Sequence, residues 1–503
     1  MSLDFEMILR NLFEVGVAAA SPSVQLPLVW QEKILPWLDQ VAPGRRRVWV
    51  FGAGKAAASM AQALEDAVAG EADEASESNR AGRFAENLKG FVITRQGYGL
   101  PTRWVEVREA SHPVPDQRGQ QAALEMLGAL AAVPPDEPVI VLISGGGSSL
   151  LSTPEPGITF EELQALNRSL LSAGTPISEI NTVRKHVCAS LGGKMARACK
   201  APIFQIIISD VPGDDPSVVA SGPFCPDSST YGDALAVLAR WDVQASDSIM
   251  NHLRSGEAGQ LEETPKAESV AFARLETCLL ASASTMLAIV ERHGMSLPAS
   301  VMQVLRSGSG ESVKPDDPRL PSLDTRLVAT PQQALQAAAE LARAHGYTPH
   351  ILSDAIEGEA RDVGQVLGAL ALQTATRGMP FQTPCALLSG GETTVTLRGN
   401  GRGGRNVECL LSFALATQGQ PRIHALMGDT DGVDGVEEIA GAHVGPDTLA
   451  RAFAAGLHPR QHLDANDGHG FFQALGQSVI TGPTRTNVND FRVILIDAPG
   501  DPA

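Results

Sequence analysis

Short apolar runs alternate with amphipathic stretches along the first half of the chain. Residues 47–51, 91–94, 139–143 and 204–209 are each apolar almost throughout, which indicates strands. After the first run, Ala56, Met60, Leu64 and Val68 are spaced for one face of a helix. Strands that are apolar on both faces and alternate with helices are typical of a parallel sheet covered by helices on both sides.

The same alternation returns in the last third of the chain. Residues 331–345 predict an alanine-rich helix, 349–352 a strand, 357–370 a helix, and 386–388 and 422–427 two further strands. We therefore expect a second α/β domain.

The segment between the two halves contains an internal repeat. Residues 234–240 (ALAVLAR) return 52 positions later, at 286–292 (MLAIVER). The sequence LRSG at 253–256 returns at 305–308, and Arg274-Leu275 returns as Arg326-Leu327, both at that same offset. Three matches in register predict a tandem duplication of roughly residues 232–283. Two copies are too few for a solenoid, so we expect a structural or connecting segment.

Composition and charge narrow the class of protein. Hydrophobic residues make up 43% and charged residues 19%, which is typical of a globular protein. Lys and Arg number 39 against 57 for Asp and Glu, and the net charge of −18 disfavours a nucleic-acid binder with a generally basic surface. A few local cations and backbone amides would still hold a small anion.

The sequence also favours a soluble cytoplasmic protein. No stretch approaches the roughly 18 apolar residues of a membrane-spanning helix, and Asp4, Glu6 and Glu14 interrupt any signal-peptide core. Six cysteines without a CxxC pair are typical of reduced thiols.

The first glycine-rich turn follows the strand at 47–51. Gly52 and Gly54 allow a tight turn and a close approach to a ligand, and Lys55 precedes a helix whose start favours an anion. With Ala57 the turn satisfies the relaxed G-x-G-x-x-A dinucleotide fingerprint, but the next strand ends at Arg95 with no acidic residue for a ribose. The residues around Lys55 do not complete a Walker A loop. A tight turn with a solvated lysine is the alternative.

A second glycine-rich loop follows the most apolar strand. Three glycines flanked by hydroxyls expose several N–H groups, an arrangement suited to phosphate, whereas a flexible loop is the alternative. The loop lacks the G-x-S-x-G pattern of an α/β-hydrolase. Its residues are Ser144, Gly145, Gly146, Gly147, Ser148 and Ser149.

Carboxylates follow the strand at 204–209. Asp210, Asp214 and Asp215 lie where they would hold Mg²⁺ or accept a hydroxyl proton. Turn chemistry also selects Asp here and explains Asp214 and Asp215 best. Asp210 comes first after the strand and is the strongest candidate for work on a substrate.

The second half repeats the glycine loops and adds fixed cations. Arg402 and Arg405 lie in a glycine-rich segment, and a guanidinium can hold a carboxylate or phosphate through two parallel bonds. A mobile loop with solvated arginines is the alternative. The other candidates of these two loops are Gly390, Gly391, Glu392, Gly403 and Gly404.

Three carboxylates, Asp429, Asp431 and Asp434, follow the strand at 422–427. They do not match the EF-hand ligand pattern, and a solvated acidic turn is the alternative.

Two basic segments leave their roles open. Pro113 and Pro115 hold His112 in an extended segment where it could face a ligand, although a satisfied structural histidine is more common. Arg184 and Lys185 are adjacent cations of a helical segment, where anion binding competes with simple solvation.

Taken together, these segments resemble the glycerate 2-kinase family with a MOFRL C-terminal domain. The matching stretches occur in the family's order and span nearly the whole chain. They are FGAGKAA from Phe51, ASHPVPD from Ala110, SGGGSSLL from Ser144, INTVRKH from Ile180, SDVPGDDPSVVASGP from Ser209, EGEARDV from Glu357, LSGGETTVT from Leu388, GRGGRN from Gly401 and GDTDGVDG from Gly428.

The resemblance implies a Rossmann-like N-terminal domain, a second α/β domain and an active-site cleft between them. We place the first domain at residues 1–231, a connecting segment with the duplication at 232–335, and the MOFRL-type domain at 336–503. The implied reaction is Mg²⁺- and ATP-dependent phosphorylation of D-glycerate at its 2-hydroxyl, giving 2-phosphoglycerate and ADP. A homodimer is compatible with the sequence, which carries no information on oligomeric state.

The family's proposed key positions correspond to Lys55, Asp210 and Arg405. Phosphoryl transfer depends on positioning and charge neutralisation. We expect Lys55 to neutralise the transferring oxygens, Asp210 to orient or deprotonate the hydroxyl, and Arg405 to hold a carboxylate or phosphate. The loop at 144–149 would cradle phosphate, whereas the metal ligands stay unassigned. The alternatives are an NAD(P)H-dependent hydroxypyruvate reductase and a non-catalytic module that binds an acidic metabolite.

Overall fold

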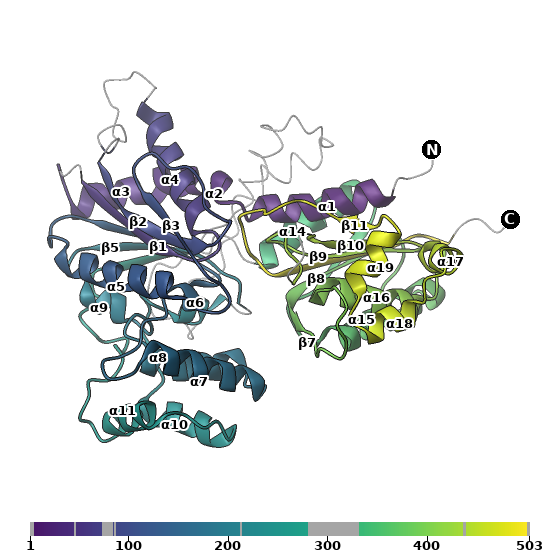
Figure 1. Cartoon of the computed structure of the whole chain (residues 1–503). Helices are drawn as coiled ribbons and strands as arrows, with labels where there is room; N and C mark the ends of the chain where they lie inside the picture. The colour runs from purple at the N-terminus through teal and green to yellow at the C-terminus, as the bar shows by residue number, and fades with distance from the viewer. Residues whose placement is uncertain are drawn as a thin grey trace.

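The computed structural model contains two α/β domains side by side, each built around one sheet (Figure 1). It describes residues 5–44, 47–72, 84, 87–211, 214–279, 331–435 and 439–499. The matching residues of the second copy of the predicted duplication, 286–292, 305–308 and 326–327, lie outside the described residues, so the duplication stays a prediction.

The first sheet has six strands in the described part of the chain, and all of them pair in parallel. The order 3-2-1-4-5-6 is that of a Rossmann fold, in which ligands bind beyond the carboxyl ends where the order reverses, here between β1 and β4. The predicted parallel sheet is confirmed. From one edge to the other, the strands are β3 (Glu106–Ala110), β2 (Leu88–Arg95), β1 (Val48–Ala53), β4 (Val139–Ser144), β5 (Ile203–Ile208) and β6 (Leu275–Leu279).

Helices cover both faces of this sheet, which explains why its strands are apolar throughout. Val141 packs into the core on one face and Leu142 into the core on the other. One face is covered by α2 (Pro22–Val29), α3 (Leu35–Val41) and α4 (Ala57–Ala72). The other face is covered by α5 (Gln117–Ala132) and α9 (Lys194–Ala198), with α7 (Phe160–Ser172), α8 (Ile177–Val187), α10 (Tyr231–Arg240) and α11 (Asp247–Glu257) beyond them (Figure 1).

The second sheet is mixed rather than wholly parallel. β7 pairs with β8 in parallel, whereas the remaining neighbours pair antiparallel. Its strand order is β11 (Ser478–Val479), β10 (Gly441–Val444), β9 (Ile423–Asp429), β12 (Asp490–Ile496), β8 (Cys385–Thr394) and β7 (Thr348–Glu359).

The helices of the second domain include one from the start of the chain. α1 (Phe5–Ala19) and α14 (Pro331–Ala344) pack together on one face of the second sheet, and α1 lies along that domain in Figure 1. The other face is covered by α15 (Ala360–Arg377), α16 (Arg405–Thr417), α17 (Thr448–Ala454), α18 (Pro459–Asp464) and α19 (Gly468–Ala474). The predicted limits of the domains, at 231 and 335, stay a prediction and did not include this packing of α1.

Two local predictions in this domain were wrong. Residues 357–359, predicted to begin a helix, belong to β7, and the helix begins at Ala360. Gly390 and Gly391, predicted to lie in a loop, pair inside β8 with Phe491 and Asp490 of β12. The long pairing with β12 carries the strand beyond its apolar residues.

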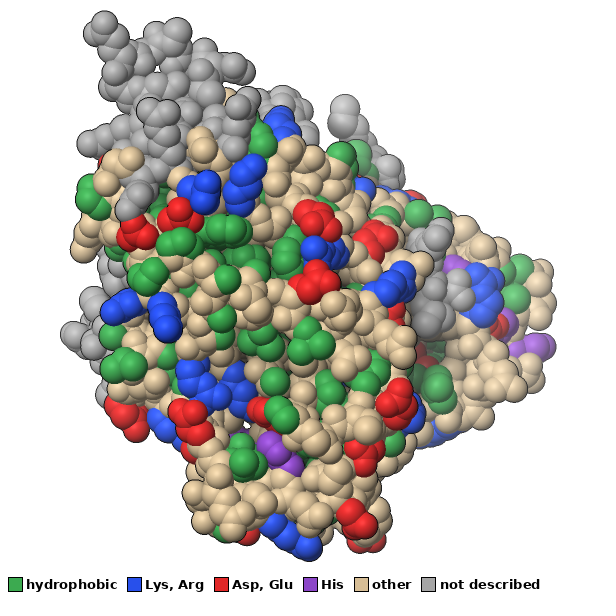
Figure 2. Space-filling view, turned by 60° about the vertical axis from the view of Figure 1, so that its left-hand side comes forward, with side chains coloured by type: hydrophobic (Ala, Val, Ile, Leu, Met, Phe, Trp, Pro, Cys, Tyr) green, Lys and Arg blue, Asp and Glu red, His purple; other side chains and the backbone are tan. Residues whose placement is uncertain are grey.

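Surface and cysteine features agree with the composition. Lysine, arginine and acidic side chains are interspersed on the face shown in Figure 2. No helix among the described residues is long and apolar enough to span a membrane. The described cysteines are buried and unpaired: Cys188, Cys199, Cys225, Cys385 and Cys409.

Candidate active site

Side chains of the two domains meet beyond the carboxyl ends of β1, β5 and β9. Lys55, two residues after β1, places its Nζ atom 2.7 Å from Oδ2 of Asp431, which follows β9. Asp210, two residues after β5, accepts a hydrogen bond of 3.0 Å at Oδ2 from Nδ2 of Asn487 in the second domain. Asn489 also donates to the main-chain oxygen of Asp210. One polar site therefore draws on both domains.

Close packing explains the glycines of the first domain. A Cβ atom at Gly145 would lie 1.6 Å from Oδ2 of Asp210. Gly54 has a φ of 138°, and a Cβ atom there would lie 2.1 Å from Oγ of Ser144. Gly52 lies inside β1, against the main chain of Leu142. These contacts bring Asp210 and the two glycine-rich segments into direct contact.

The two glycine-rich segments differ in the use of their backbone amides. The N–H groups of residues 54, 55 and 56 donate to oxygens of Ile93, Gly145 and Ser144 at 3.1, 2.9 and 3.0 Å. Among the turn and loop hydrogen bonds of the described residues, none is donated by the N–H groups of residues 145–147. The segment at 145–147 therefore retains free donors for an anion.

The serines at the end of this loop face the protein. Ser148 and Ser221 share a hydrogen bond of 2.8 Å between their hydroxyls. Ser149 donates to the carbonyl of Gly146 at 3.1 Å and lies in α6 (Gly147–Leu150). The main chain of the loop, more than these hydroxyls, is presented to a ligand.

Asp210 lies in an environment that disfavours its charge. Burial raises its pKa to about 7, and the negative charge of Glu392 adds to the increase, although Lys55 and Arg405 oppose it. A carboxylate with a pKa near neutrality can accept a proton and release it again under physiological conditions.

Arg405, the first residue of α16, is surrounded by carboxylates. Its Nε lies 2.6 Å from Oδ1 of Asp490, and its two terminal nitrogens lie 2.8 Å from Asp429 and 3.3 Å from Glu392. Burial opposes its charge, but attraction by Asp490, Asp429 and Glu392 outweighs burial and raises its pKa above the ordinary value. The predicted anion clamp is thus largely occupied by protein groups.

The glycines before α16 are fixed by the chain around them. A Cβ atom at Gly404 would lie 2.3 Å from Cγ of Asp434, and one at Gly403 would lie 2.8 Å from the main-chain oxygen of Asn466. Asp434 accepts hydrogen bonds from the backbone N–H groups of residues 406 and 407, at 3.0 and 2.9 Å. It therefore caps the start of α16.

Two aspartates of the acidic turn after β9 pair with different cations, Asp429 with Arg405 and Asp431 with Lys55. Burial and the charge of Asp431 raise the pKa of Asp429 well above its ordinary value. Burial also disfavours ionised Asp431, but Lys55 outweighs that effect and lowers the pKa of Asp431. Across the described residues, no group of three or more His, Cys, Asp or Glu side chains is arranged to hold a metal ion. The described residues therefore form no preformed cage for Mg²⁺.

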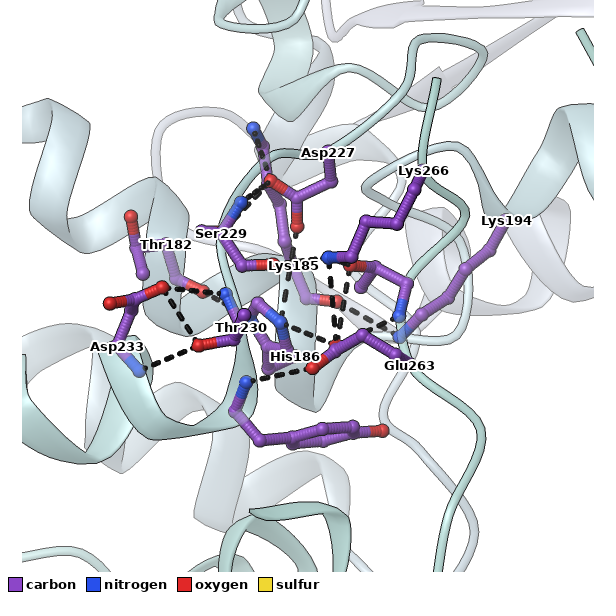
Figure 3. A network of polar contacts seen from close by, with 12 residues as sticks. Thr182, Lys185, His186, Lys194, Asp227, Ser229, Thr230, Asp233, Glu263 and Lys266 are labelled. Atoms are coloured by element: carbon purple, nitrogen blue, oxygen red, sulfur yellow. Dashed lines mark hydrogen bonds and ion pairs between the residues drawn. The ribbon is translucent and has the colours of Figure 1, made fainter. Parts of the chain in front are cut away.

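The basic segment at the end of α8 separates into two parts. Lys185 Nζ lies 3.3 Å from Oδ1 of Asp227, and Nε2 of His186 lies 3.0 Å from Glu263, inside a polar network that joins α8 to the chain around Thr230 (Figure 3). Arg184 takes no part in that network and bonds through Nε to Oδ1 of Asn167 at 2.7 Å.

Sequence reasoning missed the asparagines and the aspartate at 487–490. Asn487, Asn489 and Asp490 precede an apolar run. The residues predicted for the site were mostly polar residues and glycines that come after a predicted strand. Because β12 is antiparallel to β8 and β9, its start lies beside their ends, with Asp490 opposite Gly391 and Asp429. The polar run before the apolar FRVILI segment was the available signal.

Comparison with known proteins gives two domain matches and several full-length relatives. A domain of unknown function (DUF4147) matches residues 8–254, and the MOFRL family matches residues 385–490. A glycerate 2-kinase from Pyrococcus horikoshii is 32% identical over 90% of this chain and 87% of that protein. A putative hydroxypyruvate reductase from Agrobacterium vitis is 42% identical over 97% of this chain and 94% of that protein.

Solved structures agree with the sequence matches. The crystal structure of a glycerate kinase (EC 2.7.1.31) from Thermotoga maritima is similar to this chain with a TM-score of 0.73 and 30% identity. The similarity covers 98% of this chain and 99% of that one. The chain therefore belongs to the glycerate kinase family, and the family predicted from its motifs is confirmed.

Proposed function

We propose that the protein transfers the γ-phosphoryl group of ATP to the 2-hydroxyl of D-glycerate, giving 2-phosphoglycerate and ADP. Relatives from Pyrococcus horikoshii and Thermotoga maritima, 32% and 33% identical, are named glycerate 2-kinase and D-glycerate 2-kinase, which supports the acceptor and the position. The reaction would take place in the cytoplasm, on a small-molecule substrate and without nucleic acid or a membrane.

One observation carries the proposal: a carboxylate with a pKa of about 7, Asp210, contacts a loop with unused amides beside a lysine. Asp210 would accept the proton of the 2-hydroxyl as that oxygen attacks the γ-phosphorus and the bond to the ADP oxygen breaks. The amides of residues 145–147 and Lys55 would stabilise the negative charge spread over the transferring oxygens.

Mg²⁺ would neutralise charge on the phosphates when bound. The described carboxylates do not form a site for it by themselves, because Asp429 and Asp431 already bond to Arg405 and Lys55. We therefore assign no metal ligand and derive no step through the metal.

A hydroxypyruvate reductase is the second candidate, because two Agrobacterium vitis relatives that are 42% identical carry that name. The strand order and the G-x-G-x-x-A turn also suit a dinucleotide, and Arg95 at the end of β2 suits the 2′-phosphate of NADP. However, the amides of residues 54–56, which would bind the pyrophosphate, are already used within the protein. Amides that are already bonded within the protein cannot bind a pyrophosphate, which favours the kinase over the reductase.

Two parallel assays separate the candidates. The protein is incubated with D-glycerate and MgATP, and separately with hydroxypyruvate and NADH or NADPH. We expect ADP release and a single phosphorus NMR signal of 2-phosphoglycerate in the first assay, and no absorbance change at the nicotinamide band in the second. A 3-phosphoglycerate signal would move the reaction to the other hydroxyl, and nicotinamide oxidation without ADP would replace the kinase by a reductase.

A further inference from the structure

The cations around the glycine-rich loops fall into two groups. Lys55 and Arg405 each form ion pairs with carboxylates of the second domain. Arg95, the last residue of β2, and Arg184, on α8, have no carboxylate partner among the described residues, in a chain with a net charge of −18. The described residues therefore do not neutralise these two guanidinium groups.

Arg184 is half-buried on α8. Its Nε bonds to Asn167, and its two terminal nitrogens have no hydrogen-bond partner in the described part of the protein. Burial lowers the pKa of Arg184 below its ordinary value. A half-buried guanidinium whose terminal nitrogens have no partner among the described residues is available to an anionic ligand, and a bound carboxylate would compensate its charge.

Two unpartnered polar atoms lie in the same neighbourhood. The Tyr98 hydroxyl and Nδ1 of His112 are buried without a hydrogen-bond partner. The Arg95 guanidinium carbon lies 5.2 Å from the centre of the Tyr98 ring. Burial, and then the positive charges of Lys55, Arg95 and Arg184 among others, lower the pKa of His112 to about 3, so the imidazole is neutral. Hydrogen bonds link α8 to the glycine-rich loop: Asn181, three residues before Arg184, accepts a bond of 2.8 Å from Ser221, which shares one of 2.8 Å with Ser148.

The glycine-rich loop relates this cluster to Asp210. A Cβ atom at Gly146 would lie 2.9 Å from Nε2 of His112, and one at Gly145 would lie 1.6 Å from Asp210. Successive Cα atoms are about 3.8 Å apart, so the Asp210 carboxylate and the His112 ring flank neighbouring positions of one loop. A 2-hydroxy acid carries its carboxylate on the same carbon as its hydroxyl, so its two groups would face neighbouring positions of this loop.

We propose that Arg95 and Arg184, with Tyr98 and His112, form the subsite for the carboxylate of the three-carbon acceptor. The arginines would hold the carboxylate oxygens, and the neutral imidazole and the phenol would bond to acceptor oxygens beside them. This inference deepens the proposed function. It also applies to hydroxypyruvate, which carries the same carboxylate, so binding and reaction type can be tested separately.

Binding measurements on variants of Arg184 test the proposal. D-glycerate and ATP are titrated separately, by calorimetry, into the wild-type protein and into Arg184→Met. We expect Kd for D-glycerate to rise roughly tenfold or more, the effect of losing a charge-assisted pair, while Kd for ATP stays within about twofold. Arg168→Met is the matched control, because Arg168 is exposed on α7 next to Asn167, and its binding of both ligands should equal that of the wild type.

A second variant keeps the arginine in place. Asn167→Asp retains an oxygen for Nε of Arg184 and adds a negative charge that neutralises the guanidinium. Nδ2 of Asn167 also donates to the carbonyl of Leu163 at 3.0 Å, and aspartate lacks this donor, so we expect a lower unfolding temperature. We expect weaker D-glycerate binding with unchanged ATP binding, which separates loss of charge from a general loss of structure. Glycerol, which lacks the carboxylate, should bind equally weakly to all variants.

Two other binding results would overturn the proposal. Weakened ATP binding with unchanged D-glycerate binding would assign the arginines to a nucleotide phosphate. Unchanged binding of both ligands in Arg184→Met and Asn167→Asp would leave the arginines without a ligand. Normal carboxylate-dependent binding without ADP formation would instead contradict the kinase and leave this subsite intact.

Discussion

Replacing Asp210 by asparagine should abolish phosphoryl transfer and, at the same time, stabilise the protein above neutral pH. Asparagine keeps an oxygen that can accept the hydrogen bond from Asn487, which measures 3.0 Å in the wild type, but it cannot take a proton from the hydroxyl. Activity and stability should therefore change in opposite directions at one residue.

The size of the effect follows from the pKa of Asp210. Burial, with a contribution from Glu392, raises this pKa from 3.8 to about 7. About three pKa units at 1.36 kcal/mol each give about 4 kcal/mol as an upper limit on the cost of the ionised carboxylate in the folded protein. Partial contact of the side chain with solvent reduces it, and we expect a gain of about 2 kcal/mol in Asp210→Asn at pH 8.5.

The sign fixes the pH dependence. The folded pKa is above the unfolded pKa, so the folded state holds the proton more tightly and the wild type loses stability as pH rises from about 4 to about 7. Asp210→Asn lacks this loss, so its advantage should be small at pH 4.5 and full at pH 8.5. In the active wild type, kcat/KM should fall as pH decreases below about 7 because the base becomes protonated.

Urea unfolding at pH 4.5 and 8.5 measures the difference, with Asp362→Asn as a control at an exposed aspartate in the first turn of α15. The control should show no comparable pH-dependent gain. Equal stability of wild type and Asp210→Asn at both pH values, or retained turnover in Asp210→Asn, would refute the reasoning about this carboxylate.

Three further predictions concern the groups around Asp210. Lys55→Met should abolish turnover and lower the free energy of unfolding by about 3 kcal/mol, because Asp431 loses its partner. Adding Asp431→Asn should restore stability but not turnover. Turnover recovered in a coupled ADP assay would remove the lysine from the mechanism. Gly145→Ala should reduce kcat at least about tenfold, because the new Cβ atom displaces Asp210. Gly128→Ala, on an open helix surface, is the control: its kcat should not change, and its free energy of unfolding, measured in urea, should rise by about 1 kcal/mol. Equal kcat in both variants would contradict the close contact between residue 145 and Asp210. Arg405→Met should destabilise the second domain by about 3 kcal/mol because three carboxylates lose their counter-charge, and an unchanged unfolding midpoint would argue against that role.

The parallel sheet of the first domain was predictable because helices cover both of its faces, so its strands are apolar throughout. Residues 139–143 are apolar without interruption, since Val141 and Leu142 enter different cores. The glycine-rich loop that follows was found for the same reason, because the end of such a strand is easily recognised. Lys55 follows β1 and Asp210 follows β5, the two strands on either side of β4, and both were identified in this way.

The contribution of the second domain was harder to predict. Antiparallel pairing brings the start of β12 to the ends of β8 and β9, and no local pattern announces that pairing. Asn487 and Asp490 were missed as a result. The apolar face of α1 indicates that the helix is buried, but not that it packs on a sheet more than 300 residues away in sequence, where Phe13 meets Phe491.

The partners of each charge also depend on the fold. The sequence places Arg405 in a glycine-rich segment suited to an anion, but the fold surrounds it with Asp490, Asp429 and Glu392. Arg184 was left open between solvation and anion binding, and its half-buried position beside Asn167, with no carboxylate partner among the described residues, is visible only in three dimensions.

A crystal structure with D-glycerate and a non-hydrolysable ATP analogue tests the central claim most directly. The account predicts the 2-hydroxyl within hydrogen-bonding distance of Asp210 and phosphate oxygens on the N–H groups of residues 145–147, with Lys55 beside them. A nucleotide bound at residues 52–54 instead, or ligands remote from Asp210, would contradict it.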